Sequence, residues 1–376
     1  MFTCLCYPWP VSINGLNNNA VNLAKFALQK GQVPAGAVPT GAAAPEAQAP
    51  AVNGDGNYNK GDGNYNDFAN RDGYDPSFLG EELPMPKLSM RLQSQAAPLL
   101  NDPTNYELKY HNFSVMQHAG RATPIITAVN VDGAQYKELD RKGSWVFDGR
   151  IARQHQMGNE AYKNNDFDRG HLVRRKDAQW GSEAAKASSD TFVYTNSALQ
   201  HADFNQKTWL DLENNVFFGA VANKEKKTIF TGPVLRDDDP KFDNGGKMKN
   251  ATQIPTAFWK VQVWKDKDAG LQAEAFVMSQ EELVKGEAPS RPPLGSTPPP
   301  LKTFRVSMET LEQITDIDFG DLADGPDRTE SDKKAIADAG IIINDKPWLK
   351  NKSAPQATVG AVTDQPPDVP ITDIKL

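Results

Sequence analysis

A histidine near the middle of the chain has neighbours that suit acid–base chemistry on a phosphate. His171 follows Asp168, Arg169 and Gly170, and an imidazole with an ordinary pKa of about 6.5 can take a proton from water near neutral pH. Arg169 brings a fixed charge and a planar set of donors suited to phosphate. Gly170 permits a tight bend that would aim the histidine. A base beside a phosphate-binding group is what phosphodiester hydrolysis requires, although a single histidine can equally be structural.

A second segment contains residue types that could serve a metal. Asp203 and Gln206 have the spacing of a helix N-cap and its capping-box partner, so a helix is expected to begin near Phe204 or Asn205. On that helix Asn205 and Glu213 would lie about 80° apart in projection, so both could face the same side.

These two side chains fit a magnesium site, but they also fit an ordinary helix. Mg²⁺ keeps most of its waters and commonly takes only one or two protein oxygens. Asn205 could supply such a ligand, and Glu213 could accept hydrogen bonds from the metal's waters. The alternative is a capping asparagine and a solvated helix glutamate.

The order of these residues is that of a known family. DRGH at residues 168–171 is followed by the arrangement N-x3-Q-x4-N-x3-W-x2-LE, formed by Asn196, Gln200, Asn205, Trp209, Leu212 and Glu213. This combination resembles the DNA/RNA non-specific endonuclease family, which includes endonuclease G-like proteins and has a ββα-metal (His-Me finger) site. The resemblance covers about residues 84–323. It includes segments similar to the family's opening strands (108–131), central strand (231–235) and closing helix (306–319).

The resemblance implies a metal-dependent endonuclease that hydrolyses DNA and RNA with little sequence preference. It implies that His171 is the general base and that Asn205 and water hold one Mg²⁺ or Mn²⁺. Glu213 would orient metal-bound water, Arg169 would balance charge on the phosphate, and Asn196 would orient groups near the site.

A further phosphate-binding arginine is expected upstream of DRGH. Arg141 is our first choice because it precedes Trp145 and Asp148 much as the family's arginine precedes its tryptophan and aspartate. The spacing differs from the family's, so Arg150 and Arg153 stay open as alternatives. A solvated surface arginine is a further alternative.

The expected fold is α+β, with a central, mostly antiparallel sheet flanked by helices and a ββα-metal site. Alternation and β-branched residues predict strands at 107–115, 123–131, 192–195, 228–234, 254–264 and 271–278, and a short helix is expected at 331–339. Residues 1–83 are expected to be a flexible leader and 84–323 the nuclease domain. The domain contains a proline-rich insertion at 289–300, and residues 324–376 are expected to be a short helix and a disordered tail.

The net charge of −7 argues against a nucleic-acid partner only weakly, because charge is unevenly distributed. Residues 1–84 hold four basic and eight acidic residues, whereas Arg169, Arg174, Arg175 and Lys176 cluster around His171. Binding should therefore be modest and sensitive to salt. The only two cysteines, at positions 4 and 6, exclude a thiolate zinc site or a cysteine nucleophile in the domain.

The expected partners are DNA, RNA and a divalent metal, with a second copy of the chain or an inhibitor or immunity protein as further candidates. The N-terminus lacks a basic region and is interrupted by Pro8 and Pro10, so it is a poor secretory signal, and no apolar run is long enough to span a membrane. The compartment stays open between the cytoplasm and a non-standard export route. Two other functions also stay open: a nuclease toxin with a dedicated delivery or immunity partner, and a catalytically silent nucleic-acid-binding protein.

Overall fold

The computed structural model describes residues 65–66, 68, 70–285, 303–338 and 372–373. The proline-rich insertion and most of the expected leader and tail lie outside these residues. No helix within the described ranges is long and apolar enough to cross a membrane.

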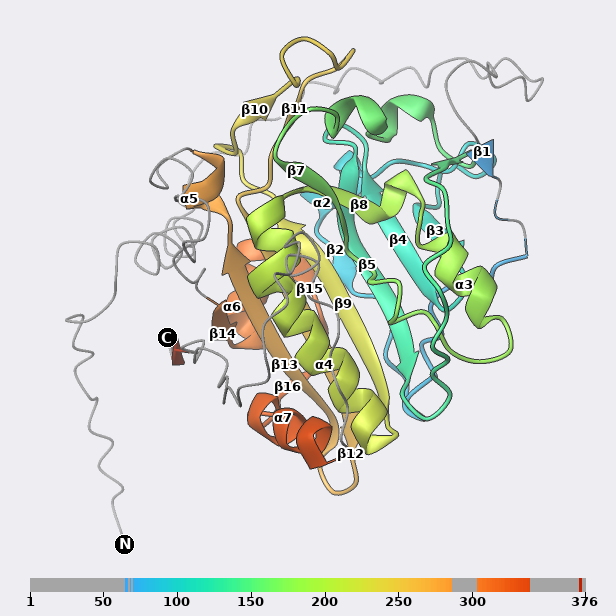
Figure 1. Cartoon of the computed structure of the whole chain (residues 1–376), viewed down its shortest axis with the longest axis vertical. Coiled ribbons are helices and arrows are strands. Elements are labelled where there is room, and N and C mark those ends of the chain that lie inside the picture. Colours follow the sequence, from blue (N-terminus) through green and yellow to red (C-terminus); the bar gives the residue numbers. More distant parts are fainter. Residues whose placement is uncertain (1–64, 67, 69, 286–302, 339–371, 374–376) are drawn as a thin grey trace, which may run out of the picture. The chain divides into compact units, whose positions relative to one another are not determined.

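The centre of the fold is a nine-stranded sheet in which the long neighbours are antiparallel (Figure 1). This confirms the predicted α+β class. Two short strands, β16 (Ala323–Asp324) and β17 (Thr372–Asp373), add in parallel to β13 and β14. In spatial order from β17 the remaining strands are β14 (Thr303–Val306), β13 (Gly270–Ser279), β12 (Ala257–Asp266), β9 (Lys226–Val234), β5 (Thr123–Asp132), β4 (Phe113–His118) and β3 (Glu107–Tyr110).

The sheet is covered on both faces, which explains why its central strands are buried along nearly their whole length. On β12, Phe258 packs against Trp209 of helix α4 (Trp209–Asn223), with 6.0 Å between ring centroids. The next residue, Trp259, points to the other face and meets Phe319 at 5.5 Å. Successive strand residues point to opposite faces, so the two contacts place α4 and the segment after α6 (Met308–Thr315) on opposite sides.

Helix α7 (Thr329–Asp338) lies beside α4 on the same face (Figure 1). The shorter elements connect these layers at the ends of the strands. They are β1 (Tyr65–Asn66), β2 (Lys87–Leu88), α2 (Met90–Gln95), β6 (Phe147–Asp148), α3 (Ala184–Asp190), β10 (Lys241–Phe242), β11 (Thr252–Gln253), α5 (Glu281–Val284) and β15 (Ile317–Asp318), with 3-10 turns at Arg153–His155, Asn159–Ala161 and Tyr194–Asn196.

Two predicted strands differ from the structure. The expected strand at 107–115 is a hairpin, β3 and β4, because Asn112 adopts a left-handed conformation (φ 68°) that turns the chain. No strand of the central sheet forms at 192–195, where the chain instead enters a 3-10 turn (Tyr194–Asn196). The strand β8 (Ser197–His201) begins directly after this turn.

The expected flexible leader is too long. From residue 70 onward the chain packs against the domain, and the Tyr74 ring lies 5.7 Å from Phe230 of the central sheet. Aromatic and aliphatic side chains of this segment are buried, namely Phe68, Tyr74, Phe78, Leu79 and Leu83. Glycine, asparagine and aspartate are frequent in the segment and obscured this apolar pattern in the sequence.

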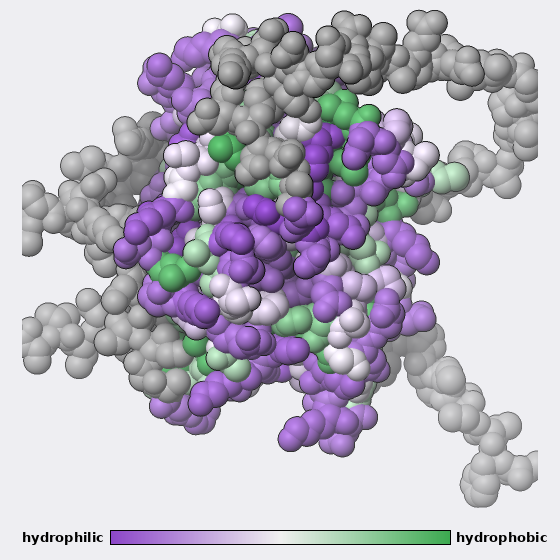
Figure 2. Space-filling model, turned by 90° about the vertical axis from the view of Figure 1, so that its right-hand side faces the viewer, coloured by the Kyte–Doolittle hydropathy of each residue, from purple (hydrophilic) through white to green (hydrophobic). Residues whose placement is uncertain are grey.

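The face shown in Figure 2 is mostly hydrophilic, and its hydrophobic residues form small, separate patches. Among the described residues, the large hydrophobic side chains with high exposure are Met90 and Leu100. Isolated exposed residues of this kind are ordinary on a protein surface.

Candidate active site

The DRGH residues lie on a short hairpin that leads into helix α4. Strand β7 (Phe167–His171) pairs antiparallel with β8, so that His171 lies opposite Ser197 and Asp168 lies opposite Gln200. After β8 the chain forms a π-helical turn (Phe204–Thr208) that continues into α4. Two antiparallel strands, separated in sequence by residues 172–196, and the helix thus form a ββα unit. It carries the motif residues apart from Asn196, which lies in the 3-10 turn just before β8.

Asn196 fixes the backbone that follows His171. Its Oδ1 accepts a hydrogen bond from the Val173 amide (2.8 Å), and its Nδ2 donates to the carbonyl oxygens of Val173 (3.0 Å) and Thr191 (3.1 Å). The side chain is fully buried. Asn196 therefore acts on the site through the chain it holds and not by contact with a ligand.

Gly170 has a different role from the tight bend expected. It lies inside β7, and it is not among the glycines with positive φ. A Cβ at this position would come within 2.0 Å of Gln200 Oε1. Glycine is needed here because the buried Gln200 side chain on the partner strand occupies the space above the backbone.

His171 lies among aromatic rings. The imidazole is 4.9 Å from the Trp145 ring and 5.2 Å from Phe192, which it meets edge to face. Its Nε2 is enclosed and has no hydrogen-bond partner among the described residues. Nε2 is therefore the ring nitrogen left without a partner, and in the neutral ring it can accept a proton when it carries none.

The environment keeps this imidazole neutral. Burial, and after it the positive charges of Arg141, Arg175 and Arg169 in that order of effect, together lower the pKa of His171 to about 3. At neutral pH the ring is therefore uncharged. The same three guanidiniums make its surroundings favourable for an anion.

The three candidate upstream arginines differ in what they already bind. Arg150 pairs with the fully buried Asp148 at 2.7 Å, and Arg153 pairs with Glu160 at 3.1 Å. Arg141 forms no hydrogen bond or ion pair with any described residue, and its guanidinium lies 5.3 Å from the Phe192 ring that also touches His171.

Arg169 also faces this group. Its guanidinium lies 5.3 Å from the Trp145 ring, and Nη1 donates to Asn159 Oδ1 at 2.8 Å. Arg174, expected from the sequence to join the cluster, instead points inward, where its Nη2 donates to Asn214 Oδ1 at 2.6 Å.

Asn205 is held by Asp168, and the predicted capping box is wrong. Asn205 Nδ2 and Gln206 Nε2 both donate to Asp168 Oδ2, at 2.9 and 2.7 Å. Asp203 makes no capping hydrogen bond, because its carboxylate pairs with Lys207 at 2.7 Å. Gln206 thus donates its side-chain hydrogen bond to Asp168 of strand β7 and does not cap the start of the helix.

The amide of Asn205 is consequently oriented. Because its Nδ2 is committed to Asp168, its Oδ1 points elsewhere, and no described residue donates to that oxygen. A neutral oxygen of this kind is suited to a hydrated divalent cation. No group of three or more histidine, cysteine or acidic side chains within the described ranges could hold a metal, so a cation here would keep most of its water.

Glu213 lies on the first part of α4 and is only 7% exposed. A π-helical turn holds more residues per turn than an α-helix, so the angle between Asn205 and Glu213 is smaller than the expected value of about 80°. Glu213 Oε1 lies 3.7 Å from Lys260 Nζ. Within the described part of the chain no hydrogen bond joins Glu213 to Asn205 or His171.

Sequence reasoning missed two buried charged residues beside Glu213. Lys260 of β12 and Asp177, which follows the DRGH strand, are 1% and 2% exposed. A lysine inside the apolar run FWKVQVW is a signal that could have identified the first, because a fully buried ammonium requires a partner. Asp177 had no comparable signal, since it lies in a charged segment.

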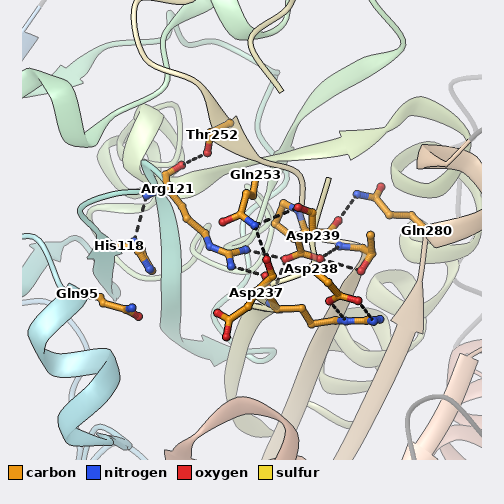
Figure 3. Close-up of polar contacts among 12 residues, drawn as sticks. Gln95, His118, Arg121, Asp237, Asp238, Asp239, Thr252, Gln253 and Gln280 are labelled. Carbon is orange, nitrogen blue, oxygen red and sulfur yellow. Dashed lines mark hydrogen bonds and ion pairs between the residues drawn. The ribbon is translucent and has the colours of Figure 1, made fainter. Parts of the chain in front are cut away.

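A polar network that includes Arg121, Asp239 and Gln280 lies beside the ββα unit (Figure 3), and Gln280 also contacts β8. Gln280, after β13, donates to the Leu199 carbonyl (3.0 Å) and accepts from the His201 amide (2.8 Å), so it binds two backbone groups on one edge of β8. Nearby, Arg121 donates to Asp239 (2.6 Å), whose other oxygen accepts from Thr256 (2.9 Å). The hairpin that carries His171 is therefore fixed to the central sheet.

Comparison with known proteins assigns the chain to a family. Residues 96–325 match the family model described as DNA/RNA non-specific endonuclease. Because the match covers more than half of the chain, the protein belongs to the DNA/RNA non-specific endonuclease family.

The chain is also 34% identical over 271 residues to the uncharacterized protein y4fB of Sinorhizobium fredii. That alignment covers 68% of this chain and 40% of y4fB, so the chain spans less than half the length of its relative. Among solved structures it is similar to a chain of the crystal structure described as the EndoG/EndoGI complex. The TM-score is 0.43 and the identity 19%, over 60% of this chain and 89% of that one.

Proposed function

We propose that this nuclease hydrolyses phosphodiester bonds of DNA and RNA with little sequence preference, with His171 as the general base. The observation that carries the proposal is the state of His171, which is neutral, has an unoccupied Nε2 and lies among three guanidiniums. An unprotonated imidazole at neutral pH and an environment that attracts a phosphate thereby coincide.

Asn205 is the residue that would hold a divalent cation, Mg²⁺ or Mn²⁺. Its oriented Oδ1, fixed through Asp168, fits an ion that takes few protein ligands. When bound, the cation would supply Lewis-acid stabilisation of the charge on the scissile phosphate and the leaving 3′-oxygen.

The protein's own groups perform the remaining steps. Arg141 and Arg169 bind the phosphate oxygens and balance the charge that develops there. His171 Nε2 takes the proton of the attacking water as the new bond to phosphorus forms and the bond to the 3′-oxygen breaks. Glu213 accepts hydrogen bonds from nearby water, and Asn196 keeps the histidine strand in register. Contacts of this kind are made to the phosphate backbone of the nucleic acid, so they do not distinguish one base sequence from another.

The test is digestion of supercoiled DNA and of a structured RNA by the full chain, with Mg²⁺, with Mn²⁺ and with EDTA. Degradation of both substrates only when metal is present is expected. If the protein bound these substrates but left both intact under every metal condition, it would be a binding protein on a nuclease fold. Cleavage confined to one short sequence would contradict the proposed lack of sequence preference.

A further inference from the structure

The face of the sheet beneath α4 contains a lysine that the reaction as described does not use. Lys260 is 1% exposed, and its Nζ donates to Thr231 Oγ1 at 2.8 Å. The ammonium lies 3.7 Å from Glu213 Oε1 and 5.1 Å from the Trp209 ring. It therefore contacts the first two turns of the helix that carries the motif glutamate.

Lys260 and three other side chains form a buried cluster of four ionisable groups, in which the numbers of acidic and basic groups are equal. Asp177 and Glu213 are the two carboxylates, and Lys260 and Arg174 are the two cations. Arg174 is itself held on α4 through its hydrogen bond to Asn214. Asp177 Oδ1 and Glu213 Oε1 are both buried without a hydrogen-bond partner among the described residues. The carboxylates thus depend on the charges of their neighbours.

Burial opposes the charged form of each of these carboxyl groups. It raises the pKa of Asp177 to about 7, and Lys260 and then Arg174 act against this rise. Burial also raises the pKa of Glu213, and Lys260 is again the strongest opposing charge. Without the ammonium, both carboxyl groups would favour their protonated forms.

We propose that Lys260 is a positioning residue for cleavage, which keeps the Glu213 carboxylate charged and fixed in direction so that it accepts hydrogen bonds from water at the active site. The proposal rests on the proposed nuclease function for the role of Glu213. Asp177 shares the same ammonium, so it competes with Glu213 for the charge of Lys260. The structure thus couples the motif glutamate on α4 to a strand far away in sequence.

The electrostatic part can be tested without catalysis. Lys260→Met and Glu213→Gln are combined in a double-mutant cycle, in the Asp177→Asn background so that Asp177 does not contribute. The unfolding equilibrium constant is measured at pH 5 and pH 8. The coupling ratio is the factor by which the effect of Lys260→Met on the unfolding equilibrium constant differs between proteins with Glu213 and with Gln at position 213. It should be at least fivefold larger at pH 8, where Glu213 is ionised when Lys260 is present. A ratio that changes less than fivefold overturns the proposal.

A matched control and a second variant keep this cycle informative. Lys265→Met removes a lysine from the same strand, but Lys265 is 45% exposed and pairs with Glu81 at 3.5 Å, so it should show no pH-dependent coupling to Glu213. If Lys260→Met fails to fold, Lys260→Gln takes its place in the cycle and the same fivefold criterion applies.

The catalytic part is read from the pH dependence of kcat/KM. Lys260→Met should shift the acid limb to higher pH and lower the plateau at least tenfold, and Lys260→Arg should recover most of the loss. An unchanged acid limb in Lys260→Met overturns the proposal. Absence of cleavage by the wild type would instead contradict the proposed nuclease function. The double-mutant cycle on stability would still show whether Lys260 keeps the Glu213 carboxylate charged.

Discussion

At the scale of single residues, the account depends on the neutral state of His171. Its pKa is about 3 in the folded protein because of burial and of Arg141, Arg175 and Arg169, whereas an unfolded chain gives about 6.5. Between these values the unfolded state binds more protons than the folded state. The stability contribution is therefore complete above pH 6.5 and is lost as the pH falls toward 3.

The first prediction concerns this pH window. Replacing His171 by glutamine removes the titration, so the free energy of unfolding should fall less steeply between pH 6.5 and 4 than in the wild type. Urea titrations at several pH values measure the difference. Parallel curves for the two proteins would show that His171 is not held neutral by its surroundings.

The second prediction separates a phosphate-binding arginine from a structural one. Arg141 forms no hydrogen bond or ion pair with a described residue, so Arg141→Ala should lower kcat/KM by about 10²- to 10³-fold, the usual effect of removing one group that stabilises transition-state charge, with little change in Tm. Lys142→Ala is the matched control, because Lys142 is adjacent in sequence and 86% exposed, and it should leave kcat/KM unchanged.

Arg150 gives the opposite pattern. Removal of its guanidinium leaves the fully buried Asp148 without its partner, which commonly costs about 3–5 kcal/mol. Arg150→Ala should therefore lower Tm strongly. If Arg141→Ala were fully active and Arg150→Ala were stable but inactive, the choice of arginine would be wrong.

At the scale of secondary-structure elements, α4 is held from below by a second buried lysine. Lys227 of β9 donates to Asp332 of α7 at 2.8 Å and to Gln262 at 2.9 Å, and both members of the ion pair are at most 1% exposed. Gly219 lets α7 approach, since a Cβ there would come within 2.4 Å of Asp332 Cγ. Helix α7, beyond the part matched to the family, therefore completes the core of this chain.

The third prediction follows from that ion pair. Asp332→Ala removes the carboxylate that pairs with the buried Lys227 ammonium and should destabilise the protein by about 3–5 kcal/mol. The double variant Lys227→Met/Asp332→Leu removes both charges and should recover much of this loss. Lys334→Ala on the same helix removes an exposed pair with Asp338 and should leave Tm unchanged. Equal Tm values for Asp332→Ala and Lys334→Ala would contradict the role assigned to α7.

The elements that the sequence predicted well are those with a local signal. Strands β9, β12 and β13 have alternating apolar residues or turn residues at their ends, and they are found close to the predicted positions, as is α7. Helix α6 was expected from the family resemblance and lies within the range 306–319. The strand at 192–195 was misplaced because Phe192 and Val193 are buried by tertiary contacts and not by a strand face. The capping box failed because Asp168 competes for Gln206, a contact made across 38 residues.

The same division applies to the site. The DRGH strand, Asn205 and Glu213 are close in sequence and have a recognisable spacing, so their grouping on one ββα unit could be foreseen. Lys260 could not be assigned, because its proximity to Glu213 depends on how β12 pairs in the sheet. Which upstream arginine faces His171 was open for the same reason.

At the scale of the whole molecule, a chain with a net charge of −7 binds a polyanion only through a local positive region. Arg141, Arg169 and Arg175 surround His171 and form that region. Long-range attraction is therefore weak, and the few direct contacts should dominate affinity.

The fourth prediction concerns salt. Two phosphate contacts, from Arg141 and Arg169, give a slope of about −1.8 in a plot of log affinity against log salt, a loss of roughly 12-fold between 50 and 200 mM. Binding of duplex DNA to His171→Ala at fixed Mg²⁺ measures this slope without cleavage. Arg141→Ala in that background should reduce the slope by about 0.9. A salt-independent dissociation constant would contradict a phosphate-binding site around His171.

The measurement that tests the central claim most directly is digestion of supercoiled plasmid by the wild type and by His171→Ala, each with Mg²⁺ and with EDTA. The account predicts degradation by the wild type with metal only, and none by a variant whose circular dichroism shows it to be folded. Undiminished cleavage by His171→Ala would contradict the assignment of the general base, and undiminished cleavage by the wild type in EDTA would contradict the metal site at Asn205.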